Sequence, residues 1–214
     1  MGYIELTFCG DWTELPELNT RFQVSFLPAD PEFVEDVRFV GGRAECLEPE
    51  DLAMIAEHTG IIHAELSFDG GDKYKAAIEA IELARTLFAN GGTGLFIETA
   101  TKVFTPRTLA EMSTNEPRIL FHFLVEVFGN QTAIMTAGMS AFQLPDIRVP
   151  YTKKTSQAAQ AAAFGIAAQM VCDGFQPTIG GFFKNTESAP VFSTRKVKPP
   201  GHDNQLGCWE LKIT

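Results

Sequence analysis

Residues 61–68 read Ile61-Ile62-His63-Ala64-Glu65-Leu66-Ser67-Phe68. From Ile62 onward, apolar side chains occupy every second position, which is the period of a strand with one buried face. The same parity places His63 and Glu65 together on the opposite face. The stretch therefore predicts a half-buried strand that carries an imidazole and a carboxylate side by side.

The neighbouring segments extend this strand into a strand–helix–strand unit. A helix is expected from Asp72 to Phe88, where apolar residues recur every three or four positions, and residues 95–97 form the next short strand. Residues 3–9 and 22–26 alternate in the same way as residues 61–68. Pro49 opens a further helix that ends before Gly60.

The second half of the chain predicts more strands than helices. Residues 119–127 alternate and pair through a Gly129-Asn130 turn with residues 132–137, which indicates a hairpin. Further strands are expected at residues 146–149, 179–183, 191–196 and 208–213, and helices at residues 105–112 and 155–172. Because this order does not alternate strictly, the sequence predicts an α+β fold with mixed, largely antiparallel sheets and helices packed on one face. We expect one domain over residues 1–214, with two related halves, about 1–105 and 117–214, as the alternative.

Charge and composition limit the classes of partner. The 214-residue chain has 27 acidic and 17 basic side chains, a formal net charge of −10, and 18 Phe. Nucleic acid and anionic membrane surfaces would be repelled on average, so neither is an expected partner. The four cysteines are scattered without metal or redox spacing, and the N-terminus has no basic patch followed by an apolar run. A reducing cytoplasm is the expected location.

Strand parity supplies the main candidate site. His122 and Glu126 share the predicted outer face of residues 119–127, as His63 and Glu65 do on theirs, and Glu98 follows the strand after the long helix. If these strands are neighbours, two imidazoles and three carboxylates converge, a set suited to acid–base chemistry or to a divalent metal. The alternative is the ordinary polar face of an antiparallel sheet, which requires no function.

Two further pairs are weaker ligand-binding candidates. Lys153 and Lys154 precede the alanine-rich helix, where positive charge opposes the helix dipole. His202 and Asp203 lie in a loop rich in proline and glycine. Solvated loop positions explain both pairs equally well, and no motif marks a serine or cysteine nucleophile.

Three stretches of the chain carry a family resemblance. They are residues 52–68, residues 94–106, and the run Gly138-Met139-Ser140-Ala141-Phe142-Gln143-Leu144-Pro145-Asp146. Together they resemble a family of bacterial α+β proteins known only as a domain of unknown function. The resemblance covers roughly residues 50–150, and it implies a fold type and a bacterial origin without any catalytic residue.

Two hypotheses of function follow. The first is a non-catalytic binding or interaction protein that self-associates or masks a basic partner, since the chain lacks an active-site motif and is acidic. The alternative is a small metal-dependent or acid–base enzyme that uses His63, Glu65, Glu98, His122 and Glu126. Whether the chain is an enzyme stays open, and substrate and cofactor are unknown on either hypothesis.

Overall fold

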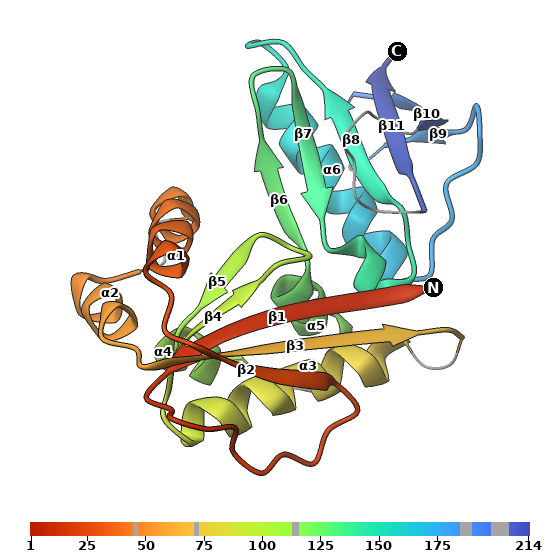
Figure 1. Cartoon of the computed structure of the whole chain (residues 1–214). Coiled ribbons are helices and arrows are strands. Elements are labelled where there is room, and N and C mark those ends of the chain that lie inside the picture. Colours follow the sequence, from red (N-terminus) through yellow and green to blue (C-terminus); the bar gives the residue numbers. More distant parts are fainter. Residues whose placement is uncertain (45–46, 71–72, 113–115, 185–189, 198–205) are drawn as a thin grey trace.

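Figure 1 shows the computed structural model of the chain, which describes residues 1–44, 47–70, 73–112, 116–184, 190–197 and 206–214. The fold is α+β, as the sequence predicts, with two mostly antiparallel sheets. Strands up to residue 104 form one sheet, called here the N-terminal sheet, and strands from residue 126 onward form the other, the C-terminal sheet. None of the helices in the described segments is long and apolar enough to cross a lipid bilayer.

Within the described residues, the N-terminal sheet has five strands in the order β2-β3-β1-β4-β5, and each neighbouring pair is antiparallel. They are β1 (Gly2–Gly10), β2 (Gln23–Pro28), β3 (Gly60–Phe68), β4 (Gly92–Ile97) and β5 (Lys102–Phe104). Strands β3 and β4 flank β1, so the predicted strand–helix–strand unit is confirmed with β1 inserted between its strands. Its helix, α3 (Lys73–Ala89), covers the face that carries Leu6 and Ala64, both fully buried.

Helices α1 (Pro31–Ala44) and α2 (Pro49–Ala56) cover one end of the opposite face, so this sheet has helices on both sides. Val37 of α1 and Ile55 of α2 are fully buried there against Cys9 of β1. Helix α2 is predicted from Pro49, but no helix is predicted for residues 31–44. Polar side chains occupy the other end of this face.

The predicted strand at residues 119–127 is wrong over most of its length. Residues Pro117–Leu124 form helix α5, and only Glu126–Gly129 form a strand, β6. Pro117 occupies the first turn, where its fixed φ suits a helix. The alternation that predicts a strand ignores Leu120 and Leu124, which are four residues apart and both buried. A segment that is apolar on both strand faces is equally a buried helix.

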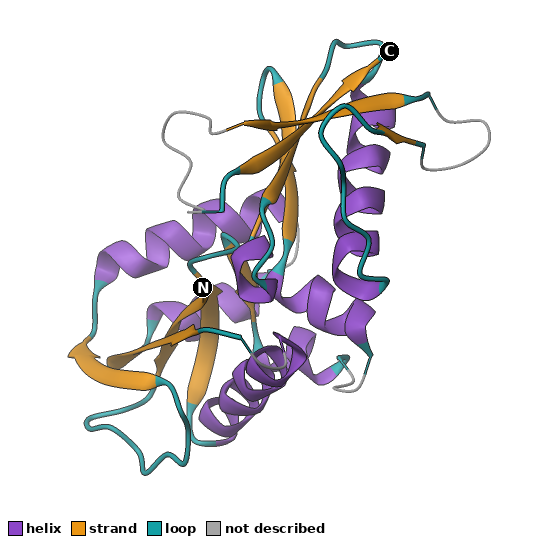
Figure 2. Ribbon diagram, turned by 90° about the vertical axis from the view of Figure 1, so that its right-hand side faces the viewer, coloured by secondary structure: helices purple, strands orange, loops and turns teal. Residues whose placement is uncertain are grey.

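Within the described residues, the C-terminal sheet has six strands in the order β6-β7-β8-β11-β10-β9, and β8 and β11 are parallel. Besides β6, they are β7 (Ala133–Ala137), β8 (Asp146–Pro150), β9 (Phe182–Phe183), β10 (Phe192–Val197) and β11 (Cys208–Ile213). Helix α6 (Ser156–Cys172) runs along one face of this sheet, as Figure 2 shows. Its buried Ala159, Ala162 and Ala163 allow the close approach that the sequence predicts.

The two sheets share one contiguous cluster of buried side chains. It contains Leu6 of β1, Phe123 of α5, Ile166 of α6 and Leu211 of β11, each fully buried. Helix α4 (Pro106–Ala110) and the 3₁₀ turn η1 (Met139–Phe142) pack at the junction of the sheets. The hypothesis of two related halves stays a prediction.

Candidate functional site

The polar end of the N-terminal sheet gathers side chains on the face opposite α3. Cross-strand register places Glu5 of β1 opposite Glu65 of β3, and Thr7 opposite His63. Their chain neighbours point toward α3, so these four side chains share the other face. We call this group the acidic face, and its members are Tyr3, Glu5, Thr7, His63, Glu65 and Glu98.

Hydrogen bonds connect the members of the acidic face. The Tyr3 hydroxyl lies 3.1 Å from Glu5 Oε2 and 3.2 Å from Glu65 Oε2, so its one proton serves two carboxylates. His63 Nε2 lies 3.0 Å from Glu5 Oε1. Thr7 Oγ1 donates to Glu98 Oε1 at 2.9 Å. Burial and then the two carboxylates raise the pKa of Tyr3, which therefore keeps its proton and acts as a donor.

Negative charge exceeds positive charge on this face. Three carboxylates meet one imidazole, and Glu5 and Glu65 are directly opposite each other, an arrangement that normally destabilises a sheet. Within the part of the chain that the structure describes, Glu65 and Glu98 each retain one oxygen without a hydrogen bond. The face therefore has unused acceptor capacity, which a cationic group would satisfy.

Glu98 is a partly buried carboxylate with a perturbed pKa. Burial raises its pKa above the ordinary value, the charge of Glu5 raises it further, and the hydrogen bond from Thr7 opposes both. A raised carboxyl pKa means that the ionised form is disfavoured in the folded protein, so ionised Glu98 destabilises the fold at neutral pH.

Replacing Glu98 by glutamine is therefore expected to raise the melting temperature at pH 7. The amide oxygen can still accept the bond from Thr7, and only the charge is lost. Below about pH 4 the carboxyl is protonated in both folded and unfolded chains, so the gain should vanish there. Thermal unfolding of wild type and Glu98→Gln at both pH values checks this, with Glu82→Gln on the exposed side of α3 as control. An equal gain at both pH values would contradict the electrostatic cause.

The turn that follows Glu98 has two unusual features. Thr99 Oγ1 is buried without a hydrogen-bond partner, the only such side-chain atom among the described residues. Thr101 has a φ of +52°, a left-handed conformation that β-branched residues seldom adopt. Its backbone N–H donates to the carbonyl of Glu98 at 3.3 Å, which closes the turn. Such strain, about 1–3 kcal/mol, concentrates at binding sites.

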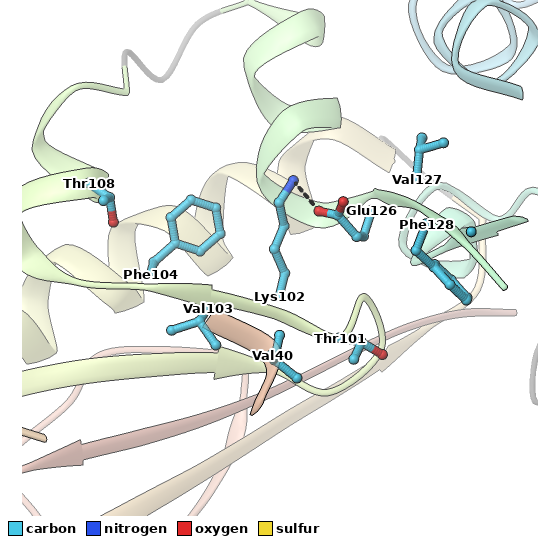
Figure 3. A pocket seen from close by; sticks show the side chains of 10 residues that line it. Val40, Thr101, Lys102, Val103, Phe104, Thr108, Glu126, Val127 and Phe128 are labelled. Atoms are coloured by element: carbon cyan, nitrogen blue, oxygen red, sulfur yellow. Dashed lines mark ion pairs between the residues drawn. The ribbon is translucent and has the colours of Figure 1, made fainter. Parts of the chain in front are cut away.

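A pocket of about 550 Å³ begins at this turn. We call it the edge pocket; it is lined by Val40 of α1, residues 101–104, Thr108, and residues 126–129 of β6. In Figure 3, Lys102 and Glu126 point toward each other in its centre, and their charged atoms are 3.2 Å apart. Its volume lies within the range of about 300–1,000 Å³ typical of ligand sites.

No family model, curated protein or solved structure matches the chain. The resemblance to an uncharacterised bacterial family therefore stays a prediction. The acidic face and the edge pocket are the features that bear on function.

Of the five residues predicted to converge, three lie together and the other two lie elsewhere. His63, Glu65 and Glu98 lie together on the acidic face, as strand parity predicts. His122 lies on helix α5, exposed, with its ring against Phe121 and Phe164. Partial burial of its ring and the neighbouring cations lower the pKa of His122, which favours the neutral imidazole. Glu126, on β6, lines the edge pocket and pairs with Lys102.

Three members of the acidic face, Tyr3, Glu5 and Thr7, are not predicted as site residues from the sequence. Their signal is present, since residues 3–9 alternate and these three share the polar side of that strand. A local pattern does not predict that β1 pairs with β3, because paired residues such as Glu5 and Glu65 are about 60 positions apart in the sequence.

The other candidates lie apart from this site or outside the described residues. Lys153 and Lys154 are exposed in the loop before α6. His202 and Asp203 fall outside the described residues. In the described segments, no group of three or more His, Cys, Asp or Glu side chains is placed to hold a metal ion. Burial raises the pKa of the Cys9 thiol to about 11, which leaves it protonated at neutral pH.

Proposed function

We propose that the chain is a non-catalytic binding protein whose acidic face receives cationic side chains of a partner protein. The observation that carries the proposal is the set of three carboxylates on one sheet face, where His63 contacts only one of them, Glu5. Glu65 and Glu98 offer free oxygens, and the hydrogen bonds from Tyr3 and Thr7 hold both carboxylates in place. Charge-assisted bonds to a guanidinium or ammonium would satisfy these oxygens.

The net charge of −10 supports the same proposal, because an acidic surface accelerates encounter with a basic one. A protein of this kind suits the role of an inhibitor that masks a basic partner.

The binding proposal is favoured over the acid–base alternative because His122 and Glu126 have no contact with the acidic face. A mass that rises with protein concentration in sedimentation would identify a second copy of the chain as the partner, and a constant mass would exclude self-association.

A labelled peptide of eight arginines is a suitable probe for this function. We expect the double variant Glu65→Gln with Glu98→Gln to lower its affinity about a hundredfold, because two charged hydrogen bonds are lost. Fluorescence anisotropy at two salt concentrations measures the dissociation constants. The control is Glu14→Gln with Glu82→Gln, which removes the same charge from exposed positions in the β1–β2 loop and on α3. Equal losses in the two double variants would mean that only net charge matters, and the proposal would fail.

A further inference from the structure

The edge pocket lies along the free edges of both sheets. Among the described residues, β5 pairs only with β4, and β6 pairs only with β7. The pocket is lined by four consecutive residues at each strand, 101–104 and 126–129. Because successive side chains of a strand point to opposite faces, a cavity that touches all four must run along the strand edge. Unpaired backbone N–H and C=O groups of an edge strand are a template for another extended chain.

Lys102 is not available to a ligand. Its ammonium group lies 2.5 Å from the carbonyl oxygen of His122, 3.0 Å from that of Val125 and 3.2 Å from Glu126 Oε2. An ammonium has three N–H donors, and all three have acceptors here. Two of those acceptors are carbonyls at the C-terminal end of α5, so Lys102 neutralises that end of the helix and ties it to β5.

Glu126 does have unused acceptor capacity. Its side chain is 31% exposed, and its contact with Lys102 involves one oxygen, Oε2. A carboxylate can accept about four hydrogen bonds. The lining also includes the apolar side chains of Val103, Phe104 and Phe128, of which Val103 and Phe104 point to opposite sides of β5. The pocket thus presents an apolar channel with one carboxylate that can still accept, which fits a long alkyl chain ending in a cation.

We propose that the edge pocket binds an extended segment of a basic protein, which pairs with the free edge of β6 and places a lysine side chain in the pocket. The alkyl part of that lysine lies against Phe104 and Phe128, and its ammonium donates to Glu126. This rests on the proposed function, since it assigns the same basic partner a second point of contact. Glu98 and Thr101 belong to one turn, so the pocket begins where the acidic face ends. Lys102 pairs with Ile97, which pairs with Leu6, so its side chain lies on the α3 side of the N-terminal sheet.

The test uses a fluorescent octapeptide of alternating lysine and valine, together with an analogue in which norleucine replaces each lysine. We expect Glu126→Gln to weaken binding of the lysine peptide roughly tenfold, because one charged hydrogen bond is lost. The same substitution should leave binding of the norleucine analogue unchanged, since that analogue has no ammonium. An equal effect on both peptides would mean that Glu126 acts through the fold, and it would overturn the assignment of the lysine to this pocket.

Strand pairing has a separate readout. A lysine–valine peptide methylated on alternate backbone nitrogens cannot pair along its methylated edge, and we expect it to bind at least about tenfold more weakly. The unmethylated peptide should slow amide hydrogen exchange in β6, and unchanged exchange there would contradict pairing. If Glu65→Gln and Glu98→Gln weaken the peptide while Glu126→Gln does not, the proposed function stands and this inference fails. If none of the three weakens it, both fail.

Discussion

Replacing Gly138 by alanine is expected to lower the free energy of unfolding by about 3–5 kcal/mol. Gly138 has a φ of +94°, where an L side chain is strained. A Cβ built on it would also lie 1.8 Å from the carbonyl oxygen of Leu124, the last residue of α5. That contact is with backbone, so no side-chain rotation can relieve it, and α5 or η1 would have to shift.

Gly174 offers a matched control for this prediction. Its φ is +70°, and a Cβ there would meet nothing within 4 Å. Gly174→Ala should therefore show the conformational cost alone, about 1–2 kcal/mol. Urea unfolding of both variants measures the difference. If the two variants lose the same stability, close packing at Gly138 is not the reason for the glycine.

The run Gly138–Asp146, which carries the family resemblance, is explained by architecture. Asp146 is buried, and its Oδ1 accepts from Thr136 Oγ1 at 3.0 Å and from the backbone N–H of Met139 at 3.3 Å. It fixes the start of η1 against β7 and β8. Gln143 at the end of η1 has a φ of +57°, so the chain turns sharply there before Pro145. The motif therefore shapes the junction of the two sheets.

Alternation predicts strands well where one face is buried and the other is polar. This holds for β1 and β3, so His63 and Glu65 are correctly placed on one outer face. It fails at α5, where buried residues occupy both parities, and a helix buries Leu120 and Leu124 on the same side as Phe121 and Phe123. The same alternation predicts a strand face for His122, and helix α5 places this residue away from the acidic face.

The rest of the site depends on pairings between distant segments. No local pattern shows that β1 lies between β3 and β4, or that the edges of β5 and β6 enclose a pocket. Glu126, a predicted site residue, lies on β6 and lines the edge pocket instead of joining the acidic face. Glu126 lies just after the C-terminal end of α5, where Lys102 donates to the carbonyl of Val125 and pairs with Glu126.

The C-terminal sheet contains a second group of charges, centred on Glu210 of β11. Its side chain is 4% exposed and pairs with Arg148 of β8 and Arg195 of β10, its cross-strand neighbours. Arg195 Nε lies 2.7 Å from Glu210 Oε1, and Lys212 Nζ is farther, at 3.8 Å. A carboxylate this deeply buried depends on its cations to offset the loss of hydration.

Replacing both arginines by methionine should therefore cost about 3 kcal/mol of unfolding free energy, because Glu210 is left buried with only the distant Lys212. Adding Glu210→Leu to that double variant should restore most of the loss, since an apolar triad of similar size has no charge to hydrate. Arg195→Met alone should cost less than about 1 kcal/mol, because its side chain is 54% exposed and Arg148 remains. Chemical denaturation of the three variants separates the causes: if the triple variant is as unstable as the double, lost arginine packing is responsible and the buried carboxylate is not.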